Sequence, residues 1–222
     1  MIEFRDVSKH YLTSRGRKVI LHGLTLILPR GAKVGVLGRN GAGKTTLIGM
    51  IAGIVRADAG EIRRTGSISW PLGFAGSFAG DLSGAQNIRF VARIYGIDTD
   101  ALVEYVQDFA ELGDFIDMPV RSYSSGMKAR LAFGLSMGVH FDWYLVDEIT
   151  AVGDTAFRKK SLSVFKHRLR DAGMLMVSHS TRTILDYCTS GLVLENGRAT
   201  YFENVKEAIA LHERNMKAPV PA

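Results

Sequence analysis

An eight-residue stretch limits the folds open to this chain more than any other feature. Residues 38–45 read Gly-Arg-Asn-Gly-Ala-Gly-Lys-Thr and match the pattern G-x-x-x-x-G-K-[ST] in full. The apolar run at residues 33–37 is typical of a buried strand, and Leu47, Ile48 and Ile51 follow with helical spacing. A strand, a glycine-rich turn and a helix in this order are the context in which the pattern forms a phosphate-binding loop.

The residue types in this loop suit a nucleoside triphosphate. Glycines let backbone N–H groups turn toward phosphate oxygens, and the helix N-terminus adds its positive end. Lys44 offers a cation to the β and γ phosphates, and the Thr45 hydroxyl can ligate Mg²⁺. A glycine-rich turn without a ligand is the alternative, which the flanking strand and helix disfavour. The predicted ligand-binding residues are Gly38, Arg39, Asn40, Gly41, Ala42, Gly43, Lys44, Thr45 and Thr46.

Two carboxylates follow another buried strand, as a phosphate-binding loop of this kind requires. Residues 143–146 are apolar, and Asp147 and Glu148 come directly after them. We expect Asp147 to hold Mg²⁺, mostly through water. Glu148 is placed to act as the general base on an attacking water, a role worth roughly 10²–10⁴-fold in rate. Alternatively, both residues only end a strand, but the loop favours the catalytic role.

The rest of the chain predicts an α/β fold with a mostly parallel sheet flanked by helices. Buried strands are expected at 143–146 and 174–177, with helices at 98–112, 127–137 and around 162–169. Residues 2–7 and 19–28 alternate like strands with one wet face, which predicts an N-terminal antiparallel β subdomain. Residues 191–202 predict a hairpin with an Asn-Gly turn. A helical subdomain is expected as an insertion at 76–134.

Composition excludes several classes of protein. Of 222 residues, 46% are hydrophobic and 23% charged, which is unlike a disordered chain. A single cysteine, Cys188, cannot form an intrachain disulfide, so a reducing compartment fits best. The longest charge-free run, at 65–80, contains Pro71 and four glycines and is a poor membrane span. The first ten residues lack the apolar core of a signal peptide.

A serine-rich segment identifies the superfamily. Residues 123–130 precede the carboxylate pair, with Gly126 21 residues before Asp147. Their Ser124 and Gly126 keep two of the five letters of the L-S-G-G-Q signature. The chain therefore resembles ATP-binding cassette (ABC) proteins along essentially its whole length. This resemblance implies a P-loop ATPase core and a single ATP-binding domain over 1–222. Its catalytic lobe would be 1–75 and 135–222, and the helical, signature-bearing subdomain 76–134.

The resemblance also assigns roles to residues outside the phosphate-binding loop. Tyr11 looks like the aromatic residue that stacks on adenine, although packing beside a strand would also explain it. Asp154 resembles the D-loop aspartate. His179 looks like the switch histidine at the γ-phosphate, although a lone histidine is more often structural. In this family two subunits form a head-to-tail dimer, so Ser124, Ser125 and Gly126 would face the ATP held by the partner.

Residues 68–88 narrow the resemblance further. Their Ser-Trp-Pro motif and Gly/Phe-rich sequence resemble those of the ATP-binding subunits of bacterial capsular polysaccharide exporters. The ATP-binding subunits of O-antigen and teichoic-acid exporters have similar Gly/Phe-rich sequences. The resemblance implies ATP and Mg²⁺ as cofactors, a homodimer, a dimeric transmembrane permease and a lipid-linked acidic polysaccharide as substrate. It leaves room for periplasmic or outer-membrane capsule export components. The location implied is the cytoplasmic face of the inner membrane, peripheral and held by the permease.

The same segment departs from the wider family. Most cassettes place a glutamine about eight residues before Leu82, where this chain has Phe74, and Gln86 comes too late to replace it. Water or a nearby group such as Ser77 would then complete the magnesium shell. The aromatic residues Trp70, Phe74 and Phe78 either pack in the core or line the groove for the permease's coupling helix.

Net charge leaves two other functions open. The chain has 28 Lys+Arg against 22 Asp+Glu, a net of +6, which permits a soluble nucleic-acid or ribosome-associated cassette protein. A small-molecule kinase with a P-loop is disfavoured by the signature-like segment. Ten Lys/Arg and two acidic residues occupy positions 1–56. We expect Arg15, Arg17 and Lys18 to lie outside the phosphate site, facing lipid headgroups, an acidic glycolipid or water.

Overall fold

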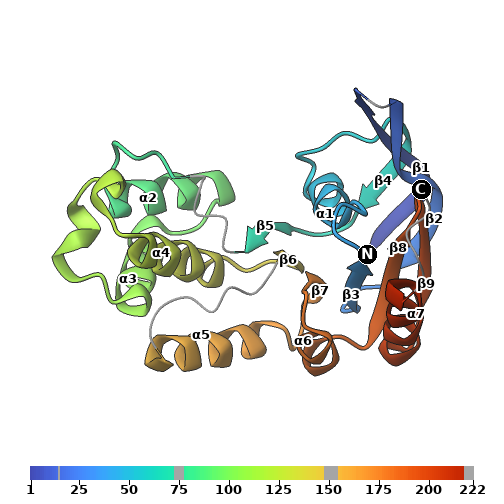
Figure 1. Cartoon of the computed structure of the whole chain (residues 1–222). Coiled ribbons are helices and arrows are strands. Elements are labelled where there is room, and N and C mark those ends of the chain that lie inside the picture. The colour runs from blue at the N-terminus through green and yellow to red at the C-terminus, as the bar shows by residue number, and fades with distance from the viewer. Residues whose placement is uncertain (15, 73–77, 148–154, 218–222) are drawn as a thin grey trace. The chain divides into compact units, whose positions relative to one another are not determined.

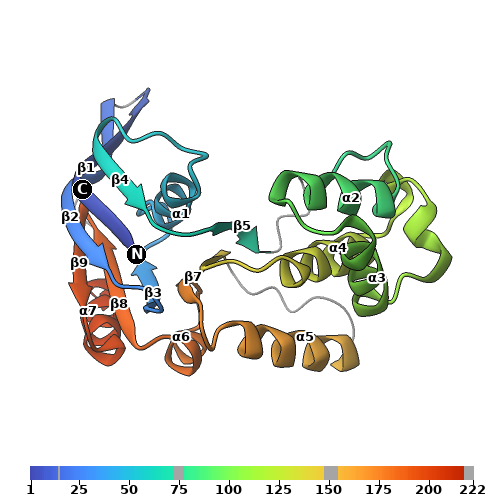
Figure 2. The same ribbon diagram turned by 180° about the vertical axis from the view of Figure 1, so that it is seen from behind.

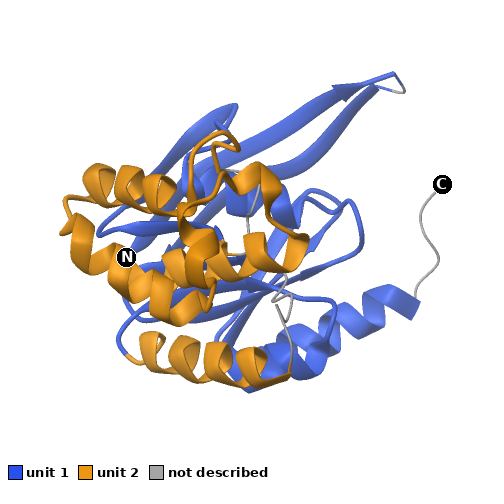
Figure 3. Cartoon of the chain, turned by 90° about the vertical axis from the view of Figure 1, so that its left-hand side faces the viewer, with its two compact units in different colours: residues 1–71, 142–148, 171–222 blue, residues 72–141, 149–170 orange. Residues whose placement is uncertain are grey.

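The computed structural model describes residues 1–14, 16–72, 78–147 and 155–217. The chain divides into two compact units, shown in different colours in Figure 3. The first unit comprises residues 1–71, 142–148 and 171–222, and the second comprises 72–141 and 149–170. Within the described residues, none of the helices combines the length and the apolar character that a membrane crossing needs.

A six-stranded sheet forms the centre of the first unit (Figure 1). Its strands lie in the order β5 (Ile68–Leu72), β6 (Trp143–Asp147), β7 (Gly173–Val177), β3 (Lys33–Gly38), β8 (Ser190–Glu195) and β9 (Arg198–Phe202). The pairs β6–β7, β7–β3 and β3–β8 are parallel, whereas β9 runs antiparallel to β8. The predicted α/β fold with a mostly parallel sheet is confirmed.

Helices cover both faces of this sheet, because side chains alternate across each strand. Val34 and Val36 of β3 share one apolar cluster with Leu47 of α1 (Lys44–Ala52). Gly35 faces the opposite side, where a Cβ atom would lie 2.6 Å from Ile184 Cγ2 of α6 (Thr181–Tyr187). Figures 1 and 2 accordingly show α1 on one side of the strands, with α6 and α7 (Val205–Lys217) on the other.

The N-terminal part of the first unit is an antiparallel sheet, in the order β2 (Gly16–Leu28), β1 (Ile2–Thr13) and β4 (Ala59–Arg64). Both β1 and β2 extend further into their hairpin than the predicted 2–7 and 19–28. The described residues beyond Val7 and before Ile20 are half-buried or exposed, so they lack the apolar alternation that marks a strand. Register shifts interrupt β1 between Phe4 and His10.

The predicted Asn-Gly turn joins β8 to β9. Asn196 and Gly197 have φ angles of 47° and 76°, as a two-residue hairpin turn with two left-handed positions requires. The turn also fixes β2, because the His22 N–H donates a 2.8 Å hydrogen bond to the Gly197 carbonyl oxygen.

Helices dominate the second unit, namely α2 (Gly84–Tyr95), α3 (Thr99–Ala110), α4 (Ser125–Gly138) and α5 (Thr155–Arg168). Capping sets where α2 and α3 begin. Asp98 accepts hydrogen bonds from the N–H groups of Asp100 and Ala101 at 3.0 and 2.8 Å. Ser83 and Gln86 form a capping box at the start of α2. The Phe109 ring packs among those of Phe133 and Phe157.

A carboxylate ties the edge of the six-stranded sheet together. Asp142, just before β6, accepts hydrogen bonds from the Ser67 N–H at 2.9 Å and the Ser67 hydroxyl at 3.1 Å. Arg30 also donates to it at 2.9 Å. The hydrogen bonds from Ser67, together with the charge of Arg30, hold the pKa of Asp142 below its usual value. The ionised carboxylate is therefore the form that stabilises this edge.

We expect Asp142→Ala to lower the free energy of unfolding by about 1–3 kcal/mol at neutral pH, because it removes hydrogen bonds to a charged group. A lowered folded-state pKa means that this stability is present above the unfolded pKa and is lost as the pH falls through the folded value. Urea unfolding at pH near 7 and near 3 measures the difference, which should shrink in acid. The exposed Asp171→Asn is the control. A penalty that is the same at both pH values would contradict the assignment.

Candidate functional site

The phosphate-binding loop lies between β3 and α1, as predicted. Gly41 and Gly43 have φ angles of 76° and 106°, in the left-handed region that favours glycine. The Ala42 N–H donates to the Arg39 carbonyl oxygen at 3.1 Å, and the Leu47 N–H donates to the Gly43 carbonyl oxygen at 2.8 Å. Gly43 is the N-cap of α1, so the loop opens directly into the positive end of the helix.

Gly43 is required for a second reason. A Cβ atom on it would lie only 2.3 Å from Cγ2 of Ile20, a buried residue of β2. The antiparallel sheet therefore packs directly against the loop, and no side chain fits between them.

A cavity of about 880 Å³ opens beside the loop, within the first unit. Among the predicted site residues, those that line it are Tyr11, Asn40, Gly41, Gly43, Lys44, Thr45, Thr46, Asp147 and His179. These residues come from four separate segments of the chain and meet around one space. Thr13, Lys18, Ile20 and Val177 complete the lining.

Lys44 is positioned by its own loop. The side chain is buried, and Nζ donates to the carbonyl oxygens of Gly38 at 2.7 Å and Arg39 at 3.1 Å. These contacts hold the ammonium group at the base of the cavity, where phosphate oxygens would reach it.

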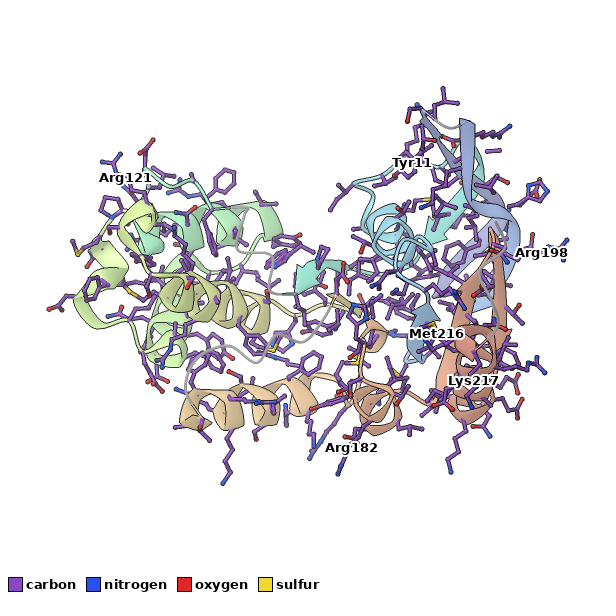
Figure 4. All side chains as sticks on the ribbon, viewed as in Figure 1. Tyr11, Arg121, Arg182, Arg198, Met216 and Lys217 are labelled. Atoms are coloured by element: carbon purple, nitrogen blue, oxygen red, sulfur yellow. The ribbon has the colours of Figure 1, made fainter. Side chains whose placement is uncertain are left out.

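Tyr11 presents a half-exposed ring to the cavity, from the hairpin of β1 and β2 (Figure 4). Lys9 Nζ lies 5.1 Å from the centroid of the ring, over one of its faces. Asp58 fixes this lysine through a 2.8 Å ion pair, and the hydrogen bond from Lys9 lowers the pKa of Asp58. A planar base stacking on Tyr11 would use the other face of the ring.

Thr45 and Asp147 both line the cavity, the first from α1 and the second from the end of β6. A hydroxyl and a carboxylate are oxygen donors of the type that Mg²⁺ prefers. The described residues contain no group of three or more His, Cys, Asp or Glu side chains that could hold a metal ion. One hydroxyl and one carboxylate leave the other ligand positions of such an ion to phosphate and water.

His179 follows β7 and borders a second hollow of about 490 Å³, which the start of the loop and α7 also line. Here Arg39 Nη2 donates to the carbonyl oxygens of Asn215 at 2.7 Å and Met216 at 3.2 Å, at the end of α7. Met216 is labelled in Figure 4. The Arg39 side chain thus caps a helix C-terminus. Burial lowers the pKa of His212, on the same helix, and the charges of Lys44 and Arg39 lower it further.

The signature-like residues lie at the start of α4, in the second unit. Ser124 is the N-cap, and its hydroxyl accepts a 3.2 Å hydrogen bond from the Met127 N–H. Ser125 and Gly126 begin the helix, and all three residues are exposed. The arrangement leaves a helix N-terminus open to solvent, as an anion site would need.

One expectation about the basic hairpin is wrong. Lys18 lines the cavity and does not lie outside the phosphate site, because β2 pairs it directly with Tyr11. Of the predicted loop residues, Gly38 and Arg39 line the second hollow instead, and Ala42 lines neither space. Glu148, Asp154, Phe74 and Ser77 lie outside the described residues. Gln86 serves in the capping box of α2.

A sequence model of the ABC transporter family matches residues 21–151. The capsule polysaccharide export ATP-binding protein CtrD of Neisseria meningitidis serogroup B is 47% identical over 208 residues, which cover 94% of this chain and 96% of CtrD. The polysialic acid transport ATP-binding protein KpsT of Escherichia coli is 44% identical over 219 residues, 97% of this chain and all of KpsT.

More distant matches agree on the fold. An O-antigen export system ATP-binding protein, RfbB of Klebsiella pneumoniae, is 33% identical over 207 residues, 91% of this chain and 84% of RfbB. Among solved structures, the ATP-binding cassette MJ0796, bound to ADP and phosphate, superposes with a TM-score of 0.76 at 16% identity. The match covers 91% of this chain and 98% of that one. The similarity supports the same α/β fold.

We expect Gly43→Ala to weaken ATP binding by tenfold or more, because a left-handed alanine costs about 1–2 kcal/mol and its Cβ would displace Ile20. Equilibrium dialysis with ATP measures the effect. Gly53→Ala is a matched control at the other end of α1, where φ is 79° but no atom lies within 4 Å of the new Cβ. This control should lose stability and keep its affinity. Equal losses of affinity in both variants would rule out a specific role for Gly43.

Proposed function

Because the chain belongs to the ABC transporter family, we propose that it is the ATP-hydrolysing subunit of an exporter that drives lipid-linked capsular polysaccharide across the bacterial inner membrane. The observation that carries this proposal is the identity of 47% and 44%, over nearly the whole chain, to CtrD and KpsT. O-antigen export is the second candidate, supported by the 33% identity to RfbB. Teichoic-acid export belongs to the same alternative as O-antigen export.

The polysaccharide that accumulates after deletion of the gene distinguishes these functions. Capsule export predicts that lipid-linked acidic polysaccharide is retained inside the cell while lipopolysaccharide stays complete. Loss of O-antigen from the surface, with a normal capsule, would move the assignment to the second candidate. A strain that keeps both surface polymers would contradict the proposal as a whole.

The cavity of the first unit supplies the contacts for ATP. The adenine would stack on the face of the Tyr11 ring opposite Lys9. The phosphates would enter the loop at Gly41, Gly43 and Lys44. Thr45 and Asp147 would hold Mg²⁺ between them. When bound, this ion supplies a Lewis acid that draws charge from the β and γ phosphate oxygens.

Hydrolysis then needs a base and a group that senses the γ-phosphate. Glu148 directly follows the metal-side Asp147 in the sequence, where a carboxylate can take a proton from water attacking phosphorus. His179 borders the cavity from the loop after β7, where it can donate to the γ-phosphate. The products are ADP and inorganic phosphate.

We expect Glu148→Gln to bind ATP and to lower its hydrolysis by about 10²–10⁴-fold, because the amide cannot accept the proton. Phosphate release measures turnover, and gel filtration with ATP should show a stabilised dimer. Glu203→Gln makes the same chemical change at an exposed position after β9 and serves as the control. Near wild-type turnover in Glu148→Gln would mean that another group is the base.

A homodimer would complete each site. The solvent-open N-terminus of α4, with Ser124 and Gly126, offers an anion site to the ATP on the partner subunit. Asp154 would lie at the same interface. Closure of the dimer would pull on a dimeric transmembrane permease, which would hold the subunit at the cytoplasmic face of the inner membrane. Periplasmic and outer-membrane export components would act beyond it, and no nucleic acid is involved.

A permease needs a docking surface, and we infer that α2 of the second unit supplies it. Phe90 and Ile94 are 61% and 62% exposed, and their i, i+4 spacing puts them on one face of the helix. Tyr95, at the end of α2, is 41% exposed. Large apolar side chains that gather on an exposed helix commonly mark a partner's binding site. Trp70 and Phe78 are only half-buried and fit the same role.

We expect Phe90→Ser combined with Ile94→Ser to reduce co-purification with the permease while ATP binding by the subunit is kept. Phe115→Ser, at an exposed phenylalanine elsewhere in the second unit, is the control and should still co-purify. Trp70→Ala and Phe78→Ala test the preceding segment. If export is lost while folding and permease binding are unchanged, a docking role for Trp70 and Phe78 is ruled out.

A further inference from the structure

A second lysine lies at the nucleotide cavity in addition to Lys44. Lys18, in β2, lines the cavity, and its Nζ lies 3.3 Å from the position that a Cβ atom on Gly41 would occupy. Gly41 is at the centre of the phosphate-binding loop. The ammonium group of Lys18 therefore reaches the loop at a different point from Lys44, which is bonded to the carbonyl oxygens of Gly38 and Arg39.

The strand register explains why Lys18 points this way. Lys18 and Tyr11 are directly opposite each other in the antiparallel pair, so their side chains share one face and their Cβ atoms are roughly 5 Å apart. Ile20, two residues along β2, faces the same way and packs on Gly43. This face of the hairpin, which also carries Thr13, forms one wall of the cavity.

The other face of the hairpin is chemically distinct. Arg17 is the neighbour of Lys18 and points to the opposite side, where its Nη2 lies 3.1 Å from His10 Nδ1. Val19 faces the turn of β8 and β9, 2.8 Å from the position of a Cβ atom on Gly197. Alternation along the strand thus assigns one basic residue to the cavity and the next to the outside.

We propose that the Lys18 ammonium group binds the phosphate chain of the nucleotide beside Gly41, as a second cation in addition to Lys44. A base stacked on Tyr11 would lie beside Lys18, which is the cross-strand neighbour of that tyrosine. From there the chain continues to Gly41 and Lys44, where the loop takes the β and γ phosphates. The role rests on the proposed ATP site and adds a residue to it.

Charge chemistry makes the contact selective for phosphorylated nucleotides. An ammonium group donates hydrogen bonds and cannot accept them, so it discriminates strongly in favour of anionic oxygens. Adenosine would gain nothing from it. ADP and ATP, whose phosphates reach Gly41, would gain.

Isothermal titration of adenosine, AMP, ADP and ATP against two matched variants tests the proposal. Lys18→Met and Arg17→Met each remove one positive charge from adjacent positions on the same strand. We expect Lys18→Met to weaken ATP and ADP binding by about tenfold, within the range of hydrogen bonds to charged groups. Adenosine affinity should stay unchanged, and Lys18→Arg should recover most of the loss. Arg17→Met should change ATP affinity by less than about twofold, since a solvent-screened charge contributes little.

Three results would overturn the proposal. Equal effects of Lys18→Met and Arg17→Met would show only a general field of the hairpin. A parallel loss of adenosine binding in Lys18→Met would show a structural role in placing Tyr11. Unchanged ATP binding in Lys18→Met would remove the contact. Lys44→Ala separates these from a failure of the ATP site itself, because that variant must lose ATP affinity wherever the site is correct.

Discussion

The contact between Gly43 and Ile20 is the constraint on which the nucleotide site depends. Because Gly43 carries no Cβ atom, β2 can pack directly on the phosphate-binding loop. This contact, together with the hydrogen bond from His22 to Gly197, fixes the antiparallel sheet against the six-stranded one. The hairpin then carries Tyr11 to the edge of the cavity. Gly43, whose positive φ angle the loop requires, thus also sets the position of Tyr11 in the antiparallel sheet.

Several polar residues of the site stabilise the fold and are also placed for a ligand. Lys44 bonds to its own loop, Ser124 caps α4, and Arg39 caps α7. Each therefore satisfies backbone groups that would otherwise lack partners. The Lys44 ammonium group has three N–H donors, so it can bind a phosphate oxygen while it keeps both of its carbonyl partners. The exception is Asp147, whose oxygens line the cavity and suit a cation.

Sequence alone was sufficient where local signals are strong, and it failed where tertiary context decides. The loop and the Asn196–Gly197 turn each follow from short patterns with one physical reason. In β4 every residue is exposed except Ile62, which is half-buried, so the strand shows no alternation of apolar and polar residues. Helix α6 has only seven residues, which is too short for a helical apolar period to be recognised. The cavity role of Lys18 depends on a register that shifts between Phe4 and His10, which no spacing rule reveals.

The positive charge of the first 56 residues can now be assigned largely to contacts within the first unit. Lys44 and Lys18 line the cavity, and Arg39 caps α7. Three other basic residues form ion pairs, namely Lys9 with Asp58, Arg5 with Glu3 at 2.8 Å, and Arg30 with Asp142. A nucleic-acid surface needs lysines and arginines gathered on one face and available to phosphates. Here they are distributed among carboxylates, a helix end and one cavity. The charge therefore favours a single small, highly anionic ligand over a polyanionic strand.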